Sequence, residues 1–250
     1  MKKRILLVFS GLLLISLIYL LGWSSLLTIS KVTIETTDPK NVTLIEAELT
    51  STGLGIDVGS PIARLNPRAI ERTLKVQPWI GEVQIERNWL SGEVDLFVRE
   101  QIPRFVVRQS GMQSSNLGDR FMTSAGVLFE LPGDLAAEYQ KLPEVELRSE
   151  STQSRIDAAT LFDLTNERFA ISKMIVTSIS TFITESEVPI FQQGEESPLR
   201  LQKMRISWGN LEEIDAKMTV IDELLALKAN RGISQIDVSN PRLPIVSKNQ

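Results

Sequence analysis

The segment that constrains this chain most is its N-terminus, where residues 5–27 contain no charged side chain. Met1-Lys2-Lys3-Arg4 precede this apolar run, and the next charged residue is Lys31. As a helix, 23 residues would measure roughly 34 Å, enough to cross the hydrocarbon core of a bilayer. Basic residues on the N-terminal flank keep that end in the cytoplasm. We therefore predict a cytoplasmic tail at residues 1–4, a transmembrane signal anchor at residues 5–27, and an extracytoplasmic location for the rest.

Two other interpretations of this run stay open. A cleaved signal peptide normally has an apolar region of about 7–15 residues, shorter than this one, although Ser24 and Ser25 are small enough for a cleavage site. A helix buried in a soluble core is the weakest alternative, because the run is apolar on every face. The length of the run favours the uncleaved anchor.

The composition removes most catalytic chemistry, since the chain has no cysteine and no histidine. Thiol nucleophiles, imidazole bases and the common zinc sites are therefore excluded. Carboxylate, lysine or tyrosine chemistry remains possible, as does no chemistry at all. With 27 basic and 31 acidic residues the net charge is −4, which disfavours nucleic acid as a partner. We expect no cofactor, no metal and no small-molecule substrate.

The first extracytoplasmic module is predicted at residues 29–102. Residues 31–35 alternate as in a half-buried strand, and residues 43–46 have the spacing of a capping box that starts a helix. Asn66-Pro67 predicts a second helix, which ends at Pro78. Two alternating strands follow, at residues 80–87 and 93–99, joined by a five-residue connection. The order β-α-α-β-β describes a small α+β domain.

A second module is predicted at residues 103–240, with a C-terminal tail at 241–250. It reads as a mostly antiparallel β domain with a C-terminal helix and strand. Glu144-Val145-Glu146 is expected in a solvated loop, and Asn210 with Glu213 has the spacing of a capping box. The remaining expected elements are a strand from Phe105, a hairpin at 121–130 turning at Ser124–Gly126, a helix within 149–167, strands at 173–184 and 199–208, a helix at 211–227 and a last strand at 233–238.

Several residues of the first module resemble the motifs of the FtsQ/DivIB family of bacterial cell-division proteins. These are Pro78 and Trp79 before the second strand, Arg87 and Trp89 at the hairpin, and Glu100 and Pro103 at the exit. The hairpin at 124–129, Trp208-Gly209, the helix at 211–227 and Ile236-Asp237-Val238 are similar to features of its second domain. The chain departs from the family pattern at Leu90, Ser124 and Ser239.

The resemblance implies a POTRA domain and a β domain that act as a scaffold rather than as an enzyme. Its implied partners are FtsB and FtsL, bitopic division proteins, bound at the cell inner membrane at the septum. The family's contacts lie near an exposed strand edge, which the sequence places within residues 233–246, with Pro241 and Pro244 limiting strand pairing beyond Asn240. The expected partner-binding residues are Ile233, Gln235, Ile236, Asp237, Val238 and Asn240.

Two other functions remain as alternatives. A membrane-anchored Ser-Lys peptidase would not need the missing histidine, because a lysine is its base. Such enzymes, however, have a Ser-Met motif at the nucleophile, and this sequence contains no Ser-Met dipeptide. A single POTRA module of a secretion or outer-membrane assembly system would ordinarily come with a barrel or with several POTRA copies. Within the first module, Trp79 and Trp89 are expected to pack, and an Arg87–Glu100 pair would be a weak surface interaction.

Overall fold

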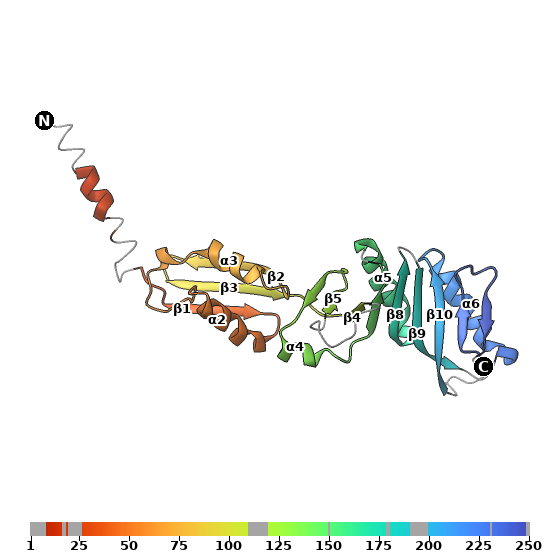
Figure 1. Ribbon diagram of the computed structural model, residues 1–250. Helices are drawn as coiled ribbons and strands as arrows, with labels where there is room; N and C mark the ends of the chain where they lie inside the picture. Colours follow the sequence, from red (N-terminus) through yellow and green to blue (C-terminus); the bar gives the residue numbers. More distant parts are fainter. Residues whose placement is uncertain are drawn as a thin grey trace. The chain divides into compact units, whose positions relative to one another are not determined.

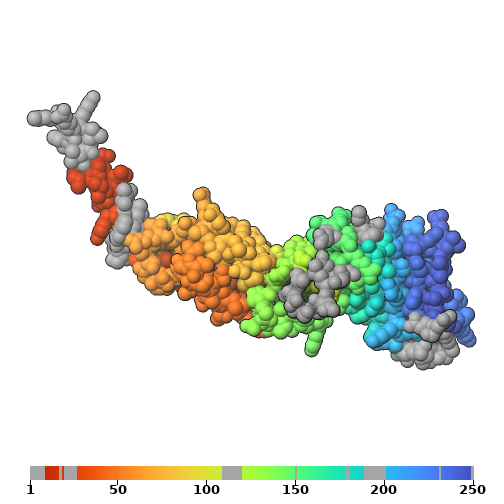
Figure 2. All heavy atoms as spheres, viewed as in Figure 1, coloured from red at the N-terminus to blue at the C-terminus, as the bar shows by residue number. Residues whose placement is uncertain are grey.

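The computed structural model describes residues 9–16, 19, 27–109, 120–149, 151–178, 181–190, 200–230 and 232–248. The chain divides into two compact units, residues 1–101 and 102–250 (Figures 1 and 2). Residues 9–16 are helical. In the described part of the chain, no helix is long and apolar enough to cross a membrane. Much of the predicted anchor, residues 5–8, 17–18 and 20–26, lies outside the described residues.

Unit 1 is a three-stranded sheet with two helices on one face. β1 runs parallel to the central strand β3, and β2 pairs antiparallel with its other side, giving the order β1-β3-β2. The predicted β-α-α-β-β order is confirmed. Its elements are β1 (Lys31–Thr36), the short 3-10 helix η1 (Pro39–Asn41), α2 (Val42–Ser51), η2 (Ile62–Arg64), α3 (Pro67–Lys75), β2 (Ile80–Asn88) and β3 (Glu93–Glu100).

The core of unit 1 follows from the alternation of its strands. Val94, Leu96 and Val98 of β3 are buried on the face that α2 and α3 cover. The buried residues of those two helices are Ile45 and Leu49 of α2 and Ile70 and Leu74 of α3. Each fully buried side chain of this size contributes about 1.5–3 kcal/mol through loss of contact with water. The opposite face of the sheet carries the alternate, mostly charged side chains.

Of the helix and strand ends predicted for unit 1, some are confirmed and others differ in the structure. The prediction for α3 is confirmed, because the Asn66 side chain accepts a hydrogen bond from the Ala69 amide and Pro67 occupies the first turn. The capping box at Thr43 was wrong: α2 continues from η1, and the Thr43 hydroxyl donates to the Lys40 carbonyl. The hairpin connection has four residues, since Asn88 still pairs with Glu93.

Unit 2 is built on a nine-stranded sheet in the order β12-β11-β10-β9-β8-β7-β4-β5-β6. The sheet is mixed, because β4–β7, β7–β8 and β10–β11 are parallel pairs. Its elements are β4 (Phe105–Gln109), β5 (Arg120–Met122), β6 (Leu128–Glu130), α4 (Gly133–Glu138), β7 (Glu144–Leu147), α5 (Thr152–Phe169), β8 (Ile171–Ser178), β9 (Thr181–Ile190), β10 (Arg200–Gly209), α6 (Ile214–Ala226), η3 (Lys228–Asn230), β11 (Gln235–Asp237) and β12 (Ile245–Ser247).

The core of unit 2 lies between one face of this sheet and the helices α5 and α6. Trp208 of β10 is fully buried there, donates from its indole N–H to the Thr184 hydroxyl at 2.9 Å, and meets the Phe169 ring edge-on. Arg168 of α5 forms an ion pair with Asp222 of α6, so the two helices lie on the same side of the sheet. Helices α5 and α6 therefore form a layer that packs against one face of the sheet and holds its C-terminal strands in place.

Four expectations for unit 2 need correction. Glu144-Val145-Glu146 is not a loop but the interior strand β7, because Val145 and Leu147 are buried between β4 and β8. The segment 173–184 is two strands, β8 and β9. The helix expected at 211–227 begins only at Ile214, and Glu213 has a left-handed backbone rather than a capping role. The predicted tail at 241–250 contributes β12 to the sheet.

Candidate interaction surfaces

The C-terminal edge of the unit 2 sheet is formed by β12 and not by β11. β11 lies between β10 and β12, paired in parallel with the first and antiparallel with the second. Three of the predicted partner-binding residues, Ile233, Ile236 and Val238, are almost completely buried in the core, so their side chains are inaccessible to a partner. The structure therefore moves the exposed edge from the segment around Ile236 to residues 245–247.

The other three predicted residues are not buried in the core, and two of them, Asp237 and Asn240, hold turns. Gln235 is exposed on β11, the Asp237 carboxylate accepts from the Ser239 amide at 2.9 Å, and the Asn240 side chain accepts from the Arg242 amide at 3.1 Å. These two turns carry the chain from β11 round to β12. Their role in the described structure is to place the edge strand.

At Val246 of β12, the main-chain N–H and C=O point away from the rest of the sheet. The Val238 amide donates to the Ser207 carbonyl and the Arg205 amide to the Ser234 carbonyl, so Ile236, which lies between them, directs its main-chain groups to β10. Ser234, just before β11, also donates from its amide to the Ser247 carbonyl of β12. Gln235 and Asp237 then face β12, opposite Ser247 and Ile245. Because successive residues of a strand direct these groups to opposite sides, the Val246 N–H and C=O face outward.

Apolar side chains accompany this outer edge. Leu243 and Ile245 are both more than half exposed, while Val246 packs its side chain against the core. Among the described residues no further strand follows β12 in the sheet order. Sequence reasoning missed this strand because Pro241 and Pro244 end the preceding pattern and only three residues follow in strand conformation.

A polar junction beside this edge joins the start of α6 to the turn after β11. A hollow of about 370 Å³ is lined there by residues including Thr181, Glu212, Lys217 and Asn240. Gly209 has φ +66°, and a Cβ at this position would lie 2.9 Å from the Ser239 Cβ. The small residues at 209 and 239 therefore allow β10 and the β11–β12 turn to approach closely.

The side chain of Lys217 is buried at this junction. Its ammonium donates to the Asn210 carbonyl at 2.9 Å and to the Asn210 side-chain oxygen at 3.1 Å. Burial lowers the pKa of Lys217 below the ordinary 10.5, while the charges of Glu212 and Glu213 act in the opposite direction. A Ser-Lys peptidase would need a buried lysine as its base. In this structure the Lys217 ammonium instead donates both hydrogen bonds to Asn210 and so holds the loop before α6.

The predicted family-motif residues lie in or just beyond β2 and β3 and do not form one cluster in the sequence. Trp79 is buried before β2, Pro78 is exposed beside it, and Pro103 is buried just after the unit boundary. The Arg87 guanidinium lies 5.3 Å from the Trp89 ring centre and donates to the Leu65 carbonyl. Trp89 is partly exposed rather than packed in the core.

Glu100 connects the end of β3 to the segment after β1. Its carboxylate accepts hydrogen bonds from the Thr37 amide at 2.7 Å and from the Asn41 side-chain amide at 3.1 Å. An Arg87–Glu100 pair does not form, because Arg87 faces Val94 and Glu100 faces Ile80, at opposite ends of the β2–β3 ladder. The motif glutamate thus fixes how the first strand leads into α2.

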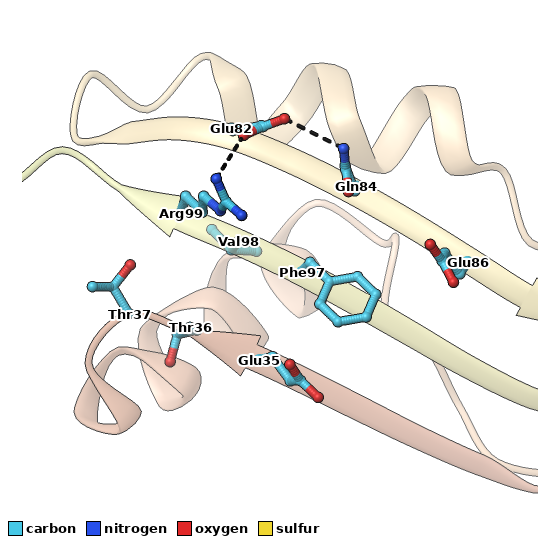
Figure 3. A pocket seen from close by; sticks show the side chains of 9 residues that line it. All are labelled: Glu35, Thr36, Thr37, Glu82, Gln84, Glu86, Phe97, Val98 and Arg99. Carbon is cyan, nitrogen blue, oxygen red and sulfur yellow. Dashed lines mark hydrogen bonds and ion pairs between the residues drawn. The ribbon is translucent and has the colours of Figure 1, made fainter.

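The open face of the unit 1 sheet carries a second candidate surface. Figure 3 shows Phe97 of β3 among the side chains of Glu35, Glu82 and Glu86, with the helices behind the sheet. These residues line a hollow of about 350 Å³. Arg99 reaches within 3.6 Å of Glu82, and the Gln84 amide donates to the same carboxylate. The face is acidic with one aromatic side chain at its centre.

A comparison with known protein families identifies this module. The family model of the POTRA domain, FtsQ-type, matches residues 40–101, which are α2, α3, β2 and β3 with their connections. Residues 40–101 form an FtsQ-type POTRA domain. The match confirms the resemblance to the FtsQ/DivIB family. A comparison with curated proteins found no match.

The rest of unit 1 completes this POTRA domain. β1 precedes the matched residues, but all of its residues pair with β3. The segment that follows the predicted anchor therefore supplies the third strand of the sheet. An FtsQ-type POTRA domain points to a member of the cell-division family, which generally consists of non-enzymatic scaffolds in the division complex. Within the described residues, no group of three carboxylates is placed to hold a metal ion.

Proposed function

We propose that the protein is a membrane-anchored scaffold of the bacterial division complex that binds other membrane division proteins. The FtsQ-type POTRA domain at residues 40–101 is the observation that carries the proposal. The apolar run at residues 5–27, with its basic N-terminal flank, supports a single-pass anchor with a cytoplasmic N-terminus. On this proposal the protein resides in the inner membrane at the division septum, with both units outside the cytoplasm.

The partner-binding edge is β12. A strand of the partner would pair with the outward N–H and C=O of Val246, and Leu243 and Ile245 would give apolar contacts beside it. Pro244 removes one donor just before this strand, which limits how much of the edge can pair with an unrelated strand. The proposed partners are bitopic division proteins resembling FtsB and FtsL.

Depletion of the protein tests the division role. Cells that lose a required scaffold should grow into filaments with unfinished septa. Normal division after complete loss would contradict this function.

Co-purification of the FtsB-like and FtsL-like proteins tests the edge. Ile245→Lys places a charge on the exposed edge and should reduce recovery of these partners about tenfold, as expected for losing one buried aliphatic contact. Leu164→Lys, at a half-exposed position on α5, is the matched control and should leave recovery unchanged. Equal recovery by both variants, each folded by circular dichroism, would reject β12 as the binding edge.

A further inference from the structure

Three apolar side chains stand exposed at one end of the POTRA domain. Val58 is 66% exposed, Trp89 40% and Leu90 99%. We call these three residues the apolar tip. Val58 belongs to the loop before η2, and Trp89 and Leu90 belong to the β2–β3 turn, where Leu90 stands in place of the family's proline. A single exposed leucine is ordinary on a protein surface, but three exposed apolar side chains on two neighbouring loops are of the kind that marks an interaction site.

The two loops that carry the apolar tip hold the segment by which the chain enters the domain. Ile29 donates to the Ser60 carbonyl at 2.9 Å and accepts from the Gly59 amide at 2.8 Å. On the other side, the Ser30 amide donates to the Gly92 carbonyl at 2.8 Å. The side chain of Ile29 is buried. The entry segment is therefore fixed between the Val58 loop and the Trp89-Leu90 turn.

The turn that carries Leu90 is preordered. The Asn88 side chain accepts hydrogen bonds from the Leu90 amide at 3.1 Å and the Ser91 amide at 3.2 Å. The Gly92 amide donates to the Asn88 carbonyl at 2.8 Å. Gly92 has φ +75°, and a Cβ there would lie 2.4 Å from the Thr28 carbonyl oxygen. The turn therefore presents Leu90 without further loss of backbone freedom, and glycine is required for its approach to the entry segment.

The apolar run ends at Leu27, whose carbonyl oxygen accepts from the Ile62 amide at 3.1 Å. Ile29, which bonds the Val58 loop, is only two residues further along the chain. Two residues span at most about 7 Å, so the apolar tip lies close to the point where the run ends. If residues 5–27 cross the bilayer, that point is at its outer surface.

We propose that the apolar tip of the POTRA domain rests in the outer interface of the membrane that its own anchor spans. This rests on the proposed signal anchor. Trp89 suits the interface because its ring is apolar and its N–H is polar, and Arg87, stacked 5.3 Å from that ring, can keep its charge in water. The anchor holds the apolar tip next to lipid, so a small apolar surface suffices for docking. A lipid fits better than a protein as the occupant, because the two loops of the apolar tip flank the segment that leads from the proposed anchor into the domain.

The charges at this end of the domain do not favour an electrostatic contact. The basic residues Lys31, Arg64 and Arg87 are largely offset by Asp57 and Glu93 in the neighbouring loops and strands, which leaves one positive charge in excess among these five. Docking should therefore depend on apolar insertion and change little with salt or with the fraction of anionic lipid.

The absence of cysteine gives a direct test with the full chain. Val58→Cys would be labelled with an environment-sensitive fluorophore, and the protein would be placed in nanodiscs of phosphatidylethanolamine and phosphatidylglycerol containing nitroxide-labelled lipid. Val76→Cys is the matched control, because Val76 is 73% exposed and precedes β2, whose nine residues separate it from the turn by roughly 30 Å. We expect strong quenching at Val58 and background quenching at Val76.

A second variant tests the contribution of Leu90. Leu90→Asp in the Val58→Cys chain should lower the ratio of docked to undocked protein about tenfold, while circular dichroism stays the same because Leu90 packs against nothing. Equal quenching at Val58 and Val76 in chains that co-purify with nanodiscs would overturn the docking proposal and leave the anchor standing. Failure of the unlabelled chain to enter nanodiscs would overturn the anchor and the docking together.

Discussion

Replacing Glu100 with alanine should destabilise the POTRA domain by about 2 kcal/mol. The carboxylate accepts from the Thr37 amide at 2.7 Å and from the Asn41 side chain at 3.1 Å. The first bond is solvent-exposed and contributes about 1 kcal/mol, because water replaces the lost acceptor. Asn41 is only 7% exposed and its side-chain oxygen has no hydrogen-bond partner, so losing Glu100 leaves the whole amide unpaired, at a cost of about 1–2 kcal/mol.

Glu100→Gln separates these two contributions. A glutamine keeps an acceptor for the Thr37 amide, and its own amide can donate to the Asn41 oxygen if the Asn41 amide rotates by half a turn. We expect a loss of about 1 kcal/mol or less, which is the charge assistance of the first bond. The exposed Glu86 on β2 provides a control, and Glu86→Ala should change stability by less than about 0.5 kcal/mol.

Hydrogen exchange on residues 27–250 measures these differences, because the opening free energy of amides in α2 and β1 reports on the POTRA domain separately from unit 2. Equal losses for Glu100→Ala and Glu100→Gln would refute the reasoning about Asn41. A Glu100→Ala protein as stable as the wild type would refute the structural role of the motif glutamate altogether.

Three further predictions concern unit 2 and the enzymatic alternative. Gly209→Ala should lower the free energy of unfolding by about 2–4 kcal/mol, because φ is +66° and the new Cβ would meet Ser239; unchanged urea denaturation would contradict this. Because the folded-state pKa of Lys217 is below 10.5, the unfolded chain binds more protons there as the pH approaches 10.5, so stability rises with pH in that window. Lys217→Met should remove this rise, and a stability difference between the two proteins that stays constant from pH 8 to 10.5 would disprove it. The purified chain should hydrolyse no signal-peptide substrate, and measurable cleavage abolished by Lys217→Met would revive the Ser-Lys peptidase.

Periodicity within single segments predicted most of unit 1. The alternation of β2 and β3 and the Asn66-Pro67 start of α3 depend on residues close in sequence, and the structure contains them. The motif residues indicated the domain, but their contacts were beyond prediction. Glu100 bonds residues 59 and 63 positions away, and nothing in local spacing identifies such partners.

The sequence predicted less of unit 2, because long-range pairing decides its strands. β7 is acidic and only four residues long, and it is a strand because β4 and β8 flank it and bury Val145 and Leu147. Similarly, β12 depends on β11 and follows two prolines that discourage a strand assignment. The start of α6 differs because Asn210 bonds Lys217 and the Glu212 amide instead of the expected helix N–H.

Localisation of the protein in growing cells tests the central claim most directly. A fluorescent protein fused to the N-terminus, which the basic residues Lys2, Lys3 and Arg4 are expected to keep in the cytoplasm, leaves both units and the β12 edge unmodified. A division scaffold predicts a band at midcell that appears before constriction and disappears after septation. A uniform signal around the envelope in dividing cells, from a fusion that supports normal growth, would contradict the proposed role in division.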